Sequence, residues 1–78
     1  MTQTEYGIKW NTINDRIECQ TAEMFAIARR LTNATYAHPN DQLNDGMKLG
    51  RCAEAVKQAQ GQMILLNRTA KNQGYKSI

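Results

Sequence analysis

Apolar residues recur every three or four positions along the first half of this chain of 78 residues. The repeated positions are Ile13, Ile17, Met24, Ile27, Ala28 and Leu31, and the residues that widen the stripe are Ala22 and Phe25. A period near 3.6 residues predicts an amphipathic α-helix. Its opposite face carries Arg16, Glu23 and Arg30, which suit contact with water.

The ends of this first predicted helix follow from residues that favour helix termini. The Thr12 hydroxyl can accept a hydrogen bond from a free backbone N–H of the first turn, and Asp15 stands three residues later, as in a capping box. We therefore expect the helix to begin at Thr12 and to end at about Asn33 or Tyr36. A short N-terminal segment would precede it.

A second apolar stripe runs through the other half of the chain. Its positions alternate by three and four residues and are Leu49, Cys52, Val56, Ala59, Met63, Leu66 and Ala70. This is the spacing of a seam that packs against another helix. The helix should begin near Asn40, because Asp41 and Asp45 then lie in its early turns, where the helix dipole favours anions. It should end before Asn72, because Gly74 suits a left-handed C-terminal cap.

Glycines accompany this second stripe. Gly46, Gly50 and Gly61 lie beside the seam, and each glycine inside a helix costs up to about 1 kcal/mol relative to alanine. Close approach of another helix backbone is the simplest compensation, so we expect a neighbouring helix at these positions. The alternative is a break between Gly46 and Gly50, which would leave a short helix before the long one.

The only proline, Pro39, separates the two predicted helices. A short turn there makes the helices antiparallel neighbours, so we expect the all-α fold class, with a single helical-hairpin domain over residues 1–78. Two helices share only one interface, and the apolar residues left over are Phe25, Val56, Ile64 and Leu65. Because so short a chain buries only a small core, we expect hairpins to assemble into a homo-oligomer.

Charge divides the chain into unequal halves. Residues 1–45 carry a formal charge of −2 and residues 46–78 carry +5, for a net charge of +3. The basic half favours an anionic partner such as a nucleotide or nucleic acid, although an ordinary solvated helix face explains the same excess. The acidic residues near the start of the first helix, Asp15 and Glu18, should approach the basic end of the second, at Arg68 and Lys71. Such exposed pairs contribute only about 0 to 1 kcal/mol.

Few side chains suit catalysis. Cys19 and Cys52 should be reduced, half-buried thiols. In the hairpin, Cys52 would lie about six residues along the second helix from the position level with Cys19, which is too far for a disulfide. With His38 as the only histidine there is no zinc ligand set and no cysteine–histidine pair, so we expect no enzyme, metal or other cofactor. No apolar run is long enough to span a membrane and no signal pattern is present. We therefore expect a cytoplasmic protein without a membrane partner.

Two dipeptides and three single residues match a pattern found in other helical hairpins. They are Phe25, Ala26, Glu54, Ala55, Ala59, Ile64 and Asn67. In this pattern the chain resembles the phage sponge proteins that sequester the cyclic nucleotide signals of the anti-phage systems CBASS and Thoeris. Lys57 and Gln58 depart from that family, which has a Met-Trp pair after Glu-Ala, and the turn of the family is shorter.

The resemblance implies a non-enzymatic, oligomeric counter-defence protein that binds an anionic cyclic nucleotide in pockets between subunits. Aromatic residues beside a cation would suit a base next to a phosphate. The candidate ligand-binding residues are Tyr6, Lys9, Trp10, Asn11 and Arg16, joined at the same end of the hairpin by Arg68 and Lys71. A competing interpretation is that Tyr6 and Trp10 merely cover the open end of the hairpin core.

Two further functions stay open. A helical inhibitor or adaptor would cover a surface of a host protein, and Met24, Met47 and Met63 would suit such an adaptable apolar contact. A small nucleic-acid-binding protein would use the basic half, although no recognition helix or aromatic repeat is evident. Salt separates the three functions. Binding to duplex phosphates weakens steeply with salt, binding of one small nucleotide weakens less, and an apolar protein interface weakens least.

Overall fold

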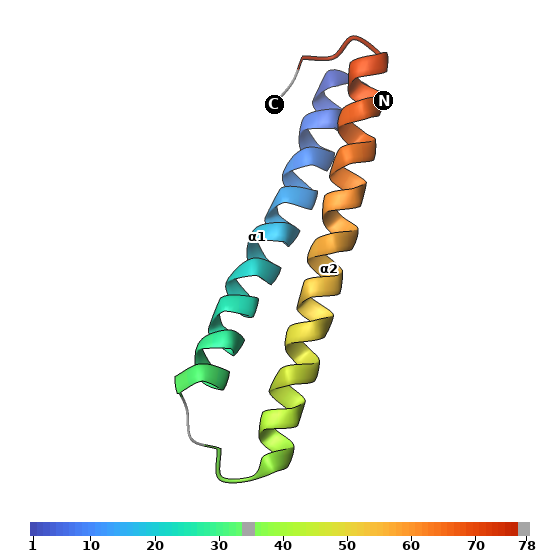
Figure 1. Ribbon diagram of the computed structural model, residues 1–78. Coiled ribbons are helices and arrows are strands. Elements are labelled where there is room, and N and C mark those ends of the chain that lie inside the picture. The colour runs from blue at the N-terminus through green and yellow to red at the C-terminus, as the bar shows by residue number, and fades with distance from the viewer. Residues whose placement is uncertain (34–35, 77–78) are drawn as a thin grey trace.

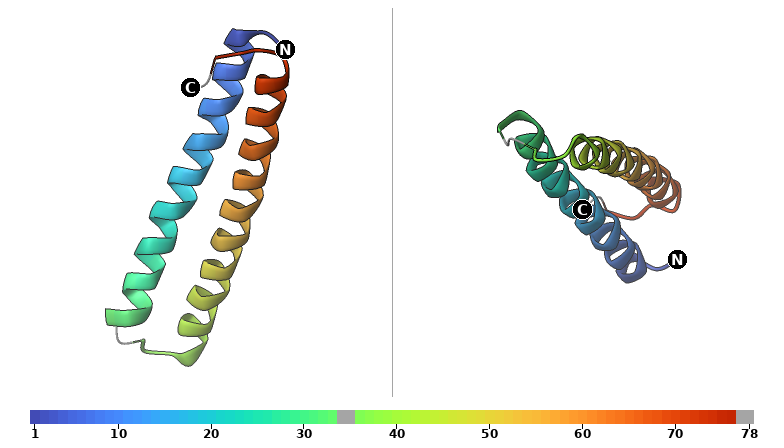
Figure 2. Two further views of the ribbon diagram at one scale, coloured as in Figure 1. Left: turned by 45° about the horizontal axis from the view of Figure 1, so that its top comes forward. Right: turned by 90° about the horizontal axis from the view of Figure 1, so that it is seen from below.

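The protein is an antiparallel hairpin of two long helices in a computed structural model that describes residues 1–33 and 36–76 (Figure 1). Helix α1 spans Gln3–Asn33 and helix α2 spans Pro39–Asn72. No strand occurs among these described residues. The predicted all-α class and the hairpin are therefore confirmed. The two helices lie side by side along a molecule of 55 × 14 × 14 Å, and their outer faces are uncovered (Figure 2).

Helix α1 begins well before the predicted start at Thr12. Thr2 supplies the cap, since its hydroxyl accepts a hydrogen bond from the backbone N–H of Glu5 at 3.1 Å. Thr12 lies inside the helix, where its hydroxyl donates to the carbonyl oxygen of Ile8 at 2.9 Å. The predicted N-terminal segment is therefore wrong. The helical apolar period continues upstream through Trp10 and Tyr6, so these residues extend the packed face of α1.

The turn lies where Pro39 predicts it. Helix α1 ends at Asn33, within the predicted limits, and Tyr36 lies outside both helices. Helix α2 begins at Pro39 itself, one residue before Asn40. A proline is favoured at the first helical position because it has no N–H group to satisfy there and its backbone angle already suits a helix.

Helix α2 is continuous through its glycines, so the predicted alternative of a break between Gly46 and Gly50 is wrong. The helix ends at Asn72, within one residue of the prediction, in a Schellman motif. The N–H of Tyr75 donates to the carbonyl oxygen of Ala70 at 2.9 Å, and the N–H of Gly74 donates to that of Lys71 at 3.1 Å. Gly74 has a φ of +76°, the left-handed conformation predicted for it.

The seam between the helices is as predicted for α2 but provides only a thin core. All seven seam residues from Leu49 to Ala70 are buried or half-buried. The buried apolar residues of the described chain are Tyr6, Ile27, Cys52, Ala59 and Ala70. Among them only Ile27 is a large side chain less than 2% exposed. Few large side chains of the described residues are therefore fully removed from water.

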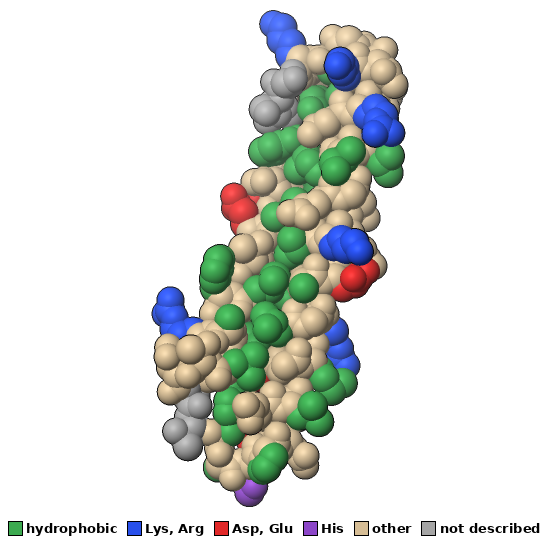
Figure 3. All heavy atoms as spheres, viewed as in Figure 1, with side chains coloured by type: hydrophobic (Ala, Val, Ile, Leu, Met, Phe, Trp, Pro, Cys, Tyr) green, Lys and Arg blue, Asp and Glu red, His purple; other side chains and the backbone are tan. Residues whose placement is uncertain are grey.

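The expected surplus of apolar surface is present. Phe25, Ile64 and Leu65 are 69%, 59% and 60% exposed, whereas Val56 lies half-buried on the seam. The space-filling view shows an apolar band along the junction of the two helices, with several basic side chains near the end where the chain termini lie (Figure 3). One side of each helix is thus used by the hairpin, and other apolar side chains are left over.

The glycines of α2 do not face α1, so the hairpin itself does not provide the neighbouring helix expected at these positions. A Cβ atom added at Gly46, Gly50 or Gly61 would meet nothing within 4 Å. The reason is angular, because these residues stand beside the seam or behind it and α1 covers only the seam itself. No neighbour within the chain therefore compensates for the cost of these glycines.

Two smaller expectations also need correction. The only ion pair within 4 Å among the described residues joins Arg30 to Asp45 at the turn end, so Arg30 does not simply face water. The predicted pairs at the opposite end do not form ion pairs. Both cysteines are free, as expected, but neither is half-buried, because Cys19 is exposed on α1 and Cys52 is buried in the seam.

Candidate functional site

The chain termini close the end of the hairpin around Tyr6. Its ring is 2% exposed and stacks on the ring of Tyr75, with centroids 6.2 Å apart and planes inclined by 21°. Its hydroxyl donates to Oδ1 of Asn67 at 2.8 Å. The side chain of Gln3 accepts the N–H of Lys76 at 3.0 Å and donates to its carbonyl oxygen at 3.2 Å. Tyr6 is therefore part of the core at this end, as the competing interpretation holds.

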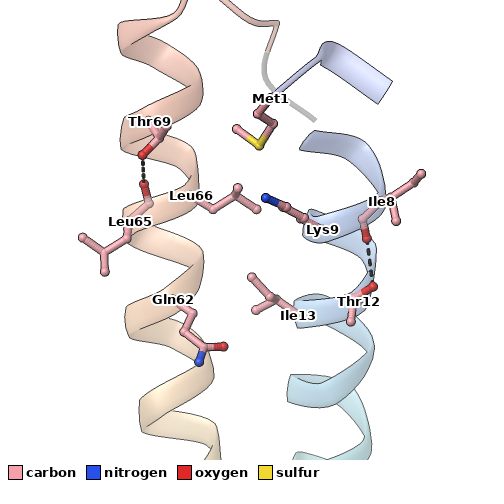
Figure 4. A pocket seen from close by; sticks show the side chains of 9 residues that line it. All are labelled: Met1, Ile8, Lys9, Thr12, Ile13, Gln62, Leu65, Leu66 and Thr69. Carbon is pink, nitrogen blue, oxygen red and sulfur yellow. Dashed lines mark hydrogen bonds between the residues drawn. The ribbon is translucent and has the colours of Figure 1, made fainter. Parts of the chain in front are cut away.

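A groove of about 560 Å³ lies between the helices close to this end (Figure 4). Grooves and clefts of this size hold small molecules in many proteins. The lining residues come from the first turns of α1 and the last turns of α2, together with Met1, and are Met1, Ile8, Lys9, Thr12, Ile13, Gln62, Leu65, Leu66 and Thr69. We refer to this feature as the Lys9 groove.

Lys9 is the only charged side chain among the described residues that line the groove. Figure 4 shows its side chain reaching from α1 toward Leu66 of α2. Ile8 and Leu65 are 61% and 60% exposed, so the walls are apolar and open to solvent. An ammonium group above apolar walls attracts an anionic group while the walls accept a flat or aliphatic part of the same molecule.

The polar atoms of the groove are few. The hydroxyl of Thr69 donates to the carbonyl oxygen of Leu65 at 3.0 Å, as that of Thr12 does to Ile8, so each hydroxyl keeps its oxygen as an acceptor. The Gln62 side chain adds an amide, which both donates and accepts. These groups could orient a bound molecule, and the sequence analysis did not single them out.

The structure does not gather the seven predicted ligand-binding residues around one cavity. Of these residues only Lys9 lines the groove. Arg16 is exposed two helical turns farther along α1 and therefore on the same side as Lys9. Tyr6 is in the core and Trp10 is half-buried, while Asn11, Arg68 and Lys71 are exposed but do not line the groove. The sequence signal that could have indicated the groove is an aliphatic residue followed four positions later by a threonine. It occurs as Ile8 and Thr12 in α1 and as Leu65 and Thr69 in α2.

The most complete polar cluster lies at the opposite end of the molecule. The carboxylate of Asp45 accepts hydrogen bonds from Nε and Nη2 of Arg30, each at 3.1 Å, and from the hydroxyl of Tyr36 at 2.7 Å. These hydrogen bonds lower the pKa of Asp45 from 3.8 to about 2. The same contacts raise the pKa of Arg30 and of Tyr36.

This cluster holds the turn in place, and its groups do not change their protonation state near neutral pH. Asp45 remains ionised there because its pKa is low, and the bidentate contact with Arg30 holds it in place. The three side chains join the end of α1, the turn and the second turn of α2. We therefore assign the cluster a structural role.

Two further grooves are lined mainly by apolar side chains. One, of about 420 Å³, lies between the helices and is formed by Thr21, Met24, Phe25, Ala28, Leu49 and Ala53. The other, of about 520 Å³, lies beside the first turns of α2 and is formed by Pro39, Gln42, Leu43, Gly46 and Met47. Neither contains a charged side chain, so both suit contact with an apolar surface better than with an anion.

Within the described ranges, no group of three or more histidine, cysteine, aspartate or glutamate side chains is placed to hold a metal ion. A search of the same ranges finds no helix with the length and apolar character needed to cross a membrane. No protein-family model matches this chain, and no curated protein or solved structure is significantly similar to it. The resemblance to the sponge hairpins therefore stays a prediction based on the matching residues.

Proposed function

We propose that this protein acts by binding, and that self-associating hairpins sequester a small anionic nucleotide without changing it. The observation that supports this function best is the Lys9 groove, which combines one cation with apolar walls. A nucleotide has the complementary parts, since it carries phosphate charge and a flat base. In the counter-defence role implied by the resemblance, the bound nucleotide would be a cyclic signal removed from solution.

In this proposal the phosphate lies against the Lys9 ammonium, with Arg16 as a second cation on the same side of α1. The base or ribose lies on the apolar wall formed with Leu65 and Leu66, where it removes apolar surface from water. Hydroxyl and amide groups of the groove would hydrogen-bond the sugar or the base edge. Tyr6 takes no part, because its ring and its hydroxyl are already engaged in the core.

Substitution of Lys9 by methionine tests the proposal. Calorimetry against a panel of cyclic dinucleotides, cyclic trinucleotides and cyclised ADP-ribose derivatives should give binding that Lys9→Met weakens at least about tenfold, since a charge-assisted contact contributes about 1.5 to 3 kcal/mol. The matched control is Arg29→Met, which removes an exposed charge from α1 far from the groove. It should leave the affinity unchanged.

The outcomes separate the site from the function. Equal affinity of Lys9→Met and the native protein would place the ligand elsewhere, and absence of binding across the panel would contradict nucleotide sequestration. The ligand recovered by chromatography after denaturing the complex should be identical to the one added. A changed product would show that the protein is an enzyme.

A second function is a helical inhibitor of a host protein, and one specific observation favours it. Leu43 and Met47 are 63% and 51% exposed beside the apolar groove at the turn end. Exposed apolar side chains around a groove are typical of protein-binding surfaces. In this case Leu43→Ser should abolish binding of the host protein, and the affinity should change little with salt. Steep loss of affinity with salt would instead indicate nucleic acid.

A further inference from the structure

A second stripe with heptad spacing runs along α2 in addition to the seam against α1. Its residues alternate by four and three positions and are Leu43, Met47, Gly50, Glu54, Lys57, Gly61, Ile64 and Arg68. Every one of them is exposed, whereas every residue of the seam is buried or half-buried. We call this set the outer stripe. Three of the eight, Leu43, Met47 and Ile64, are apolar, and the heptad spacing keeps all eight on one side of α2, as in a helix that pairs with another helix.

The outer stripe faces away from α1. Each of its residues from Met47 to Arg68 stands two positions before a seam residue, as Gly50 does before Cys52, and two positions correspond to about 200° around a helix. The open surroundings of Gly50 and Gly61 agree with this placement, since no described residue lies within 4 Å of a Cβ added at either position. The outer stripe is therefore free for a partner outside the hairpin.

The outer stripe is symmetric about the point between Ala55 and Val56. When α2 is placed antiparallel to a second copy of itself about that point, Met47 lies level with Ile64 of the partner subunit. Gly50 lies level with Gly61 of the partner subunit, and Glu54 lies level with Lys57 of the partner subunit. The symmetry produces each of these pairs twice. Antiparallel coiled coils pair their two kinds of heptad position in this way.

We propose that two copies of this chain associate through the outer stripes of their α2 helices, antiparallel and about a two-fold axis beside Ala55 and Val56. A surface that pairs with itself about such an axis needs residues that complement their own symmetry mates. The six residues from Met47 to Ile64 meet that condition, whereas at each end Leu43 lies level with Arg68 of the partner subunit. The charges are complementary in the antiparallel register only. In a parallel register Glu54 would meet Glu54 of the partner subunit.

The glycines acquire a role in this dimer. Gly50 opposite Gly61 of the partner subunit allows the two α2 backbones to approach closely, and the apolar stems of Glu54 and Lys57 can lie over the resulting space. Met47 and Ile64, 51% and 59% exposed in the single chain, become the apolar contacts on either side. The cost of glycine in the helix is thus compensated by a partner that the hairpin itself does not provide.

The exposed area of the chain is large enough for such an interface. Its accessible surface is 5838 Å², whereas a compact monomer of 8.8 kDa exposes about 4,800 Å² by the usual scaling with mass. The excess is roughly 1,000 Å², and a stable interface buries about 800 Å² on each partner. A second copy is therefore an occupant whose size and chemistry both fit.

Substitutions that reverse the charges of Glu54 and Lys57, at the centre of the outer stripe, test the antiparallel register. In sedimentation equilibrium the native protein should dimerise, and Glu54→Lys or Lys57→Glu alone should weaken the dimer at least about tenfold, because the two-fold axis repeats each like-charge contact. The double variant Glu54→Lys with Lys57→Glu restores opposite charges across the axis and should return the dimer constant to near the native value. The matched control Glu23→Lys makes the same charge change at an exposed position of α1 and should have little effect.

Each outcome decides the proposal. Equal weakening in both single variants and in the double variant would exclude the antiparallel register, and a native protein that stays monomeric at high micromolar concentration would overturn the dimer. Gly61→Gln provides a second route, since glutamine favours helix but its side chain would separate the backbones. It should raise helicity in circular dichroism and still weaken the dimer.

The inference rests on the self-association in the proposed function and is independent of the ligand. Lys9 and Arg16 belong to α1, outside the outer stripe. Nucleotide binding measured by calorimetry on the same charge variants therefore reports on the proposed function separately. A variant that loses the dimer but keeps its nucleotide affinity would agree with nucleotide binding in the Lys9 groove. A protein that forms the dimer but binds no nucleotide would agree with dimerisation through the outer stripe and contradict the proposed function.

Discussion

Single residues at the two ends of the hairpin determine how the helices are joined. At the turn end, Asp45 accepts hydrogen bonds from Arg30 and Tyr36. At the other end, the hydroxyl of Tyr6 donates a hydrogen bond to Asn67 and its ring stacks on the ring of Tyr75. Neither arrangement is visible in the residue pattern alone, since each depends on the register of the two helices. This is why Arg30 was placed on the polar face of its helix, and why the sequence left both ligand binding and a place in the core open for Tyr6.

The carboxylate of Asp45 makes the stability of the hairpin depend on pH. Its pKa is about 2 in the folded chain, against 3.8 ordinarily, so its contribution is complete above pH 3.8 and is lost as the pH falls toward 2. We expect the melting temperature to fall over that interval. Asp45→Asn should lower it by several degrees at neutral pH and by much less at pH 2. Asp41→Asn, on the same helix and exposed, is the control that should change little.

Thermal unfolding followed by circular dichroism measures this prediction. A difference between Asp45→Asn and the native protein that stays constant from neutral pH to pH 2 would show that the contact contributes through shape alone. Such a result would exclude the ionised carboxylate as the source of the stabilisation.

At the scale of the helix, the apolar spacing predicted most of the fold. The seam from Leu49 to Ala70, the turn at Pro39 and the cap at Gly74 all follow from local chemistry, because spacing, proline and glycine act on the backbone directly. The start of α1 was missed because Thr12 resembles a cap and Thr2 caps equally well. The Lys9 groove was predicted only through Lys9, since its walls depend on which turns of the two helices meet.

Two glycines, one inside α2 and one in its C-terminal cap, should respond to substitution in opposite directions. Gly46 is helical, exposed and outside the outer stripe, so Gly46→Ala should stabilise the protein by up to about 1 kcal/mol. Gly74 has a φ of +76°, so Gly74→Ala should destabilise it by about 1 to 2 kcal/mol. Urea unfolding of the two variants beside the native protein measures both changes. A gain in stability from Gly74→Ala would contradict the cap.

In the molecule as a whole, two long helices enclose a thin core and leave many apolar side chains exposed for contact with other molecules. Among the described residues, only Ile27 is a large side chain less than 2% exposed, while six large apolar residues are more than half exposed. The hairpin seam uses one side of α2, the outer stripe uses the opposite side, and the Lys9 groove lies between the helices near the chain termini. Self-association and ligand binding therefore occupy different surfaces of the same hairpin.

The measurement that tests this account most directly is native mass spectrometry of the protein after incubation with the panel of cyclic nucleotides. It reports the number of chains and the mass of any bound ligand together. We expect a dimer of the 8.8 kDa chain that carries a nucleotide of unchanged mass, with less nucleotide retained by Lys9→Met. A spectrum of single chains without ligand, at protein and nucleotide concentrations in the high micromolar range, would contradict it.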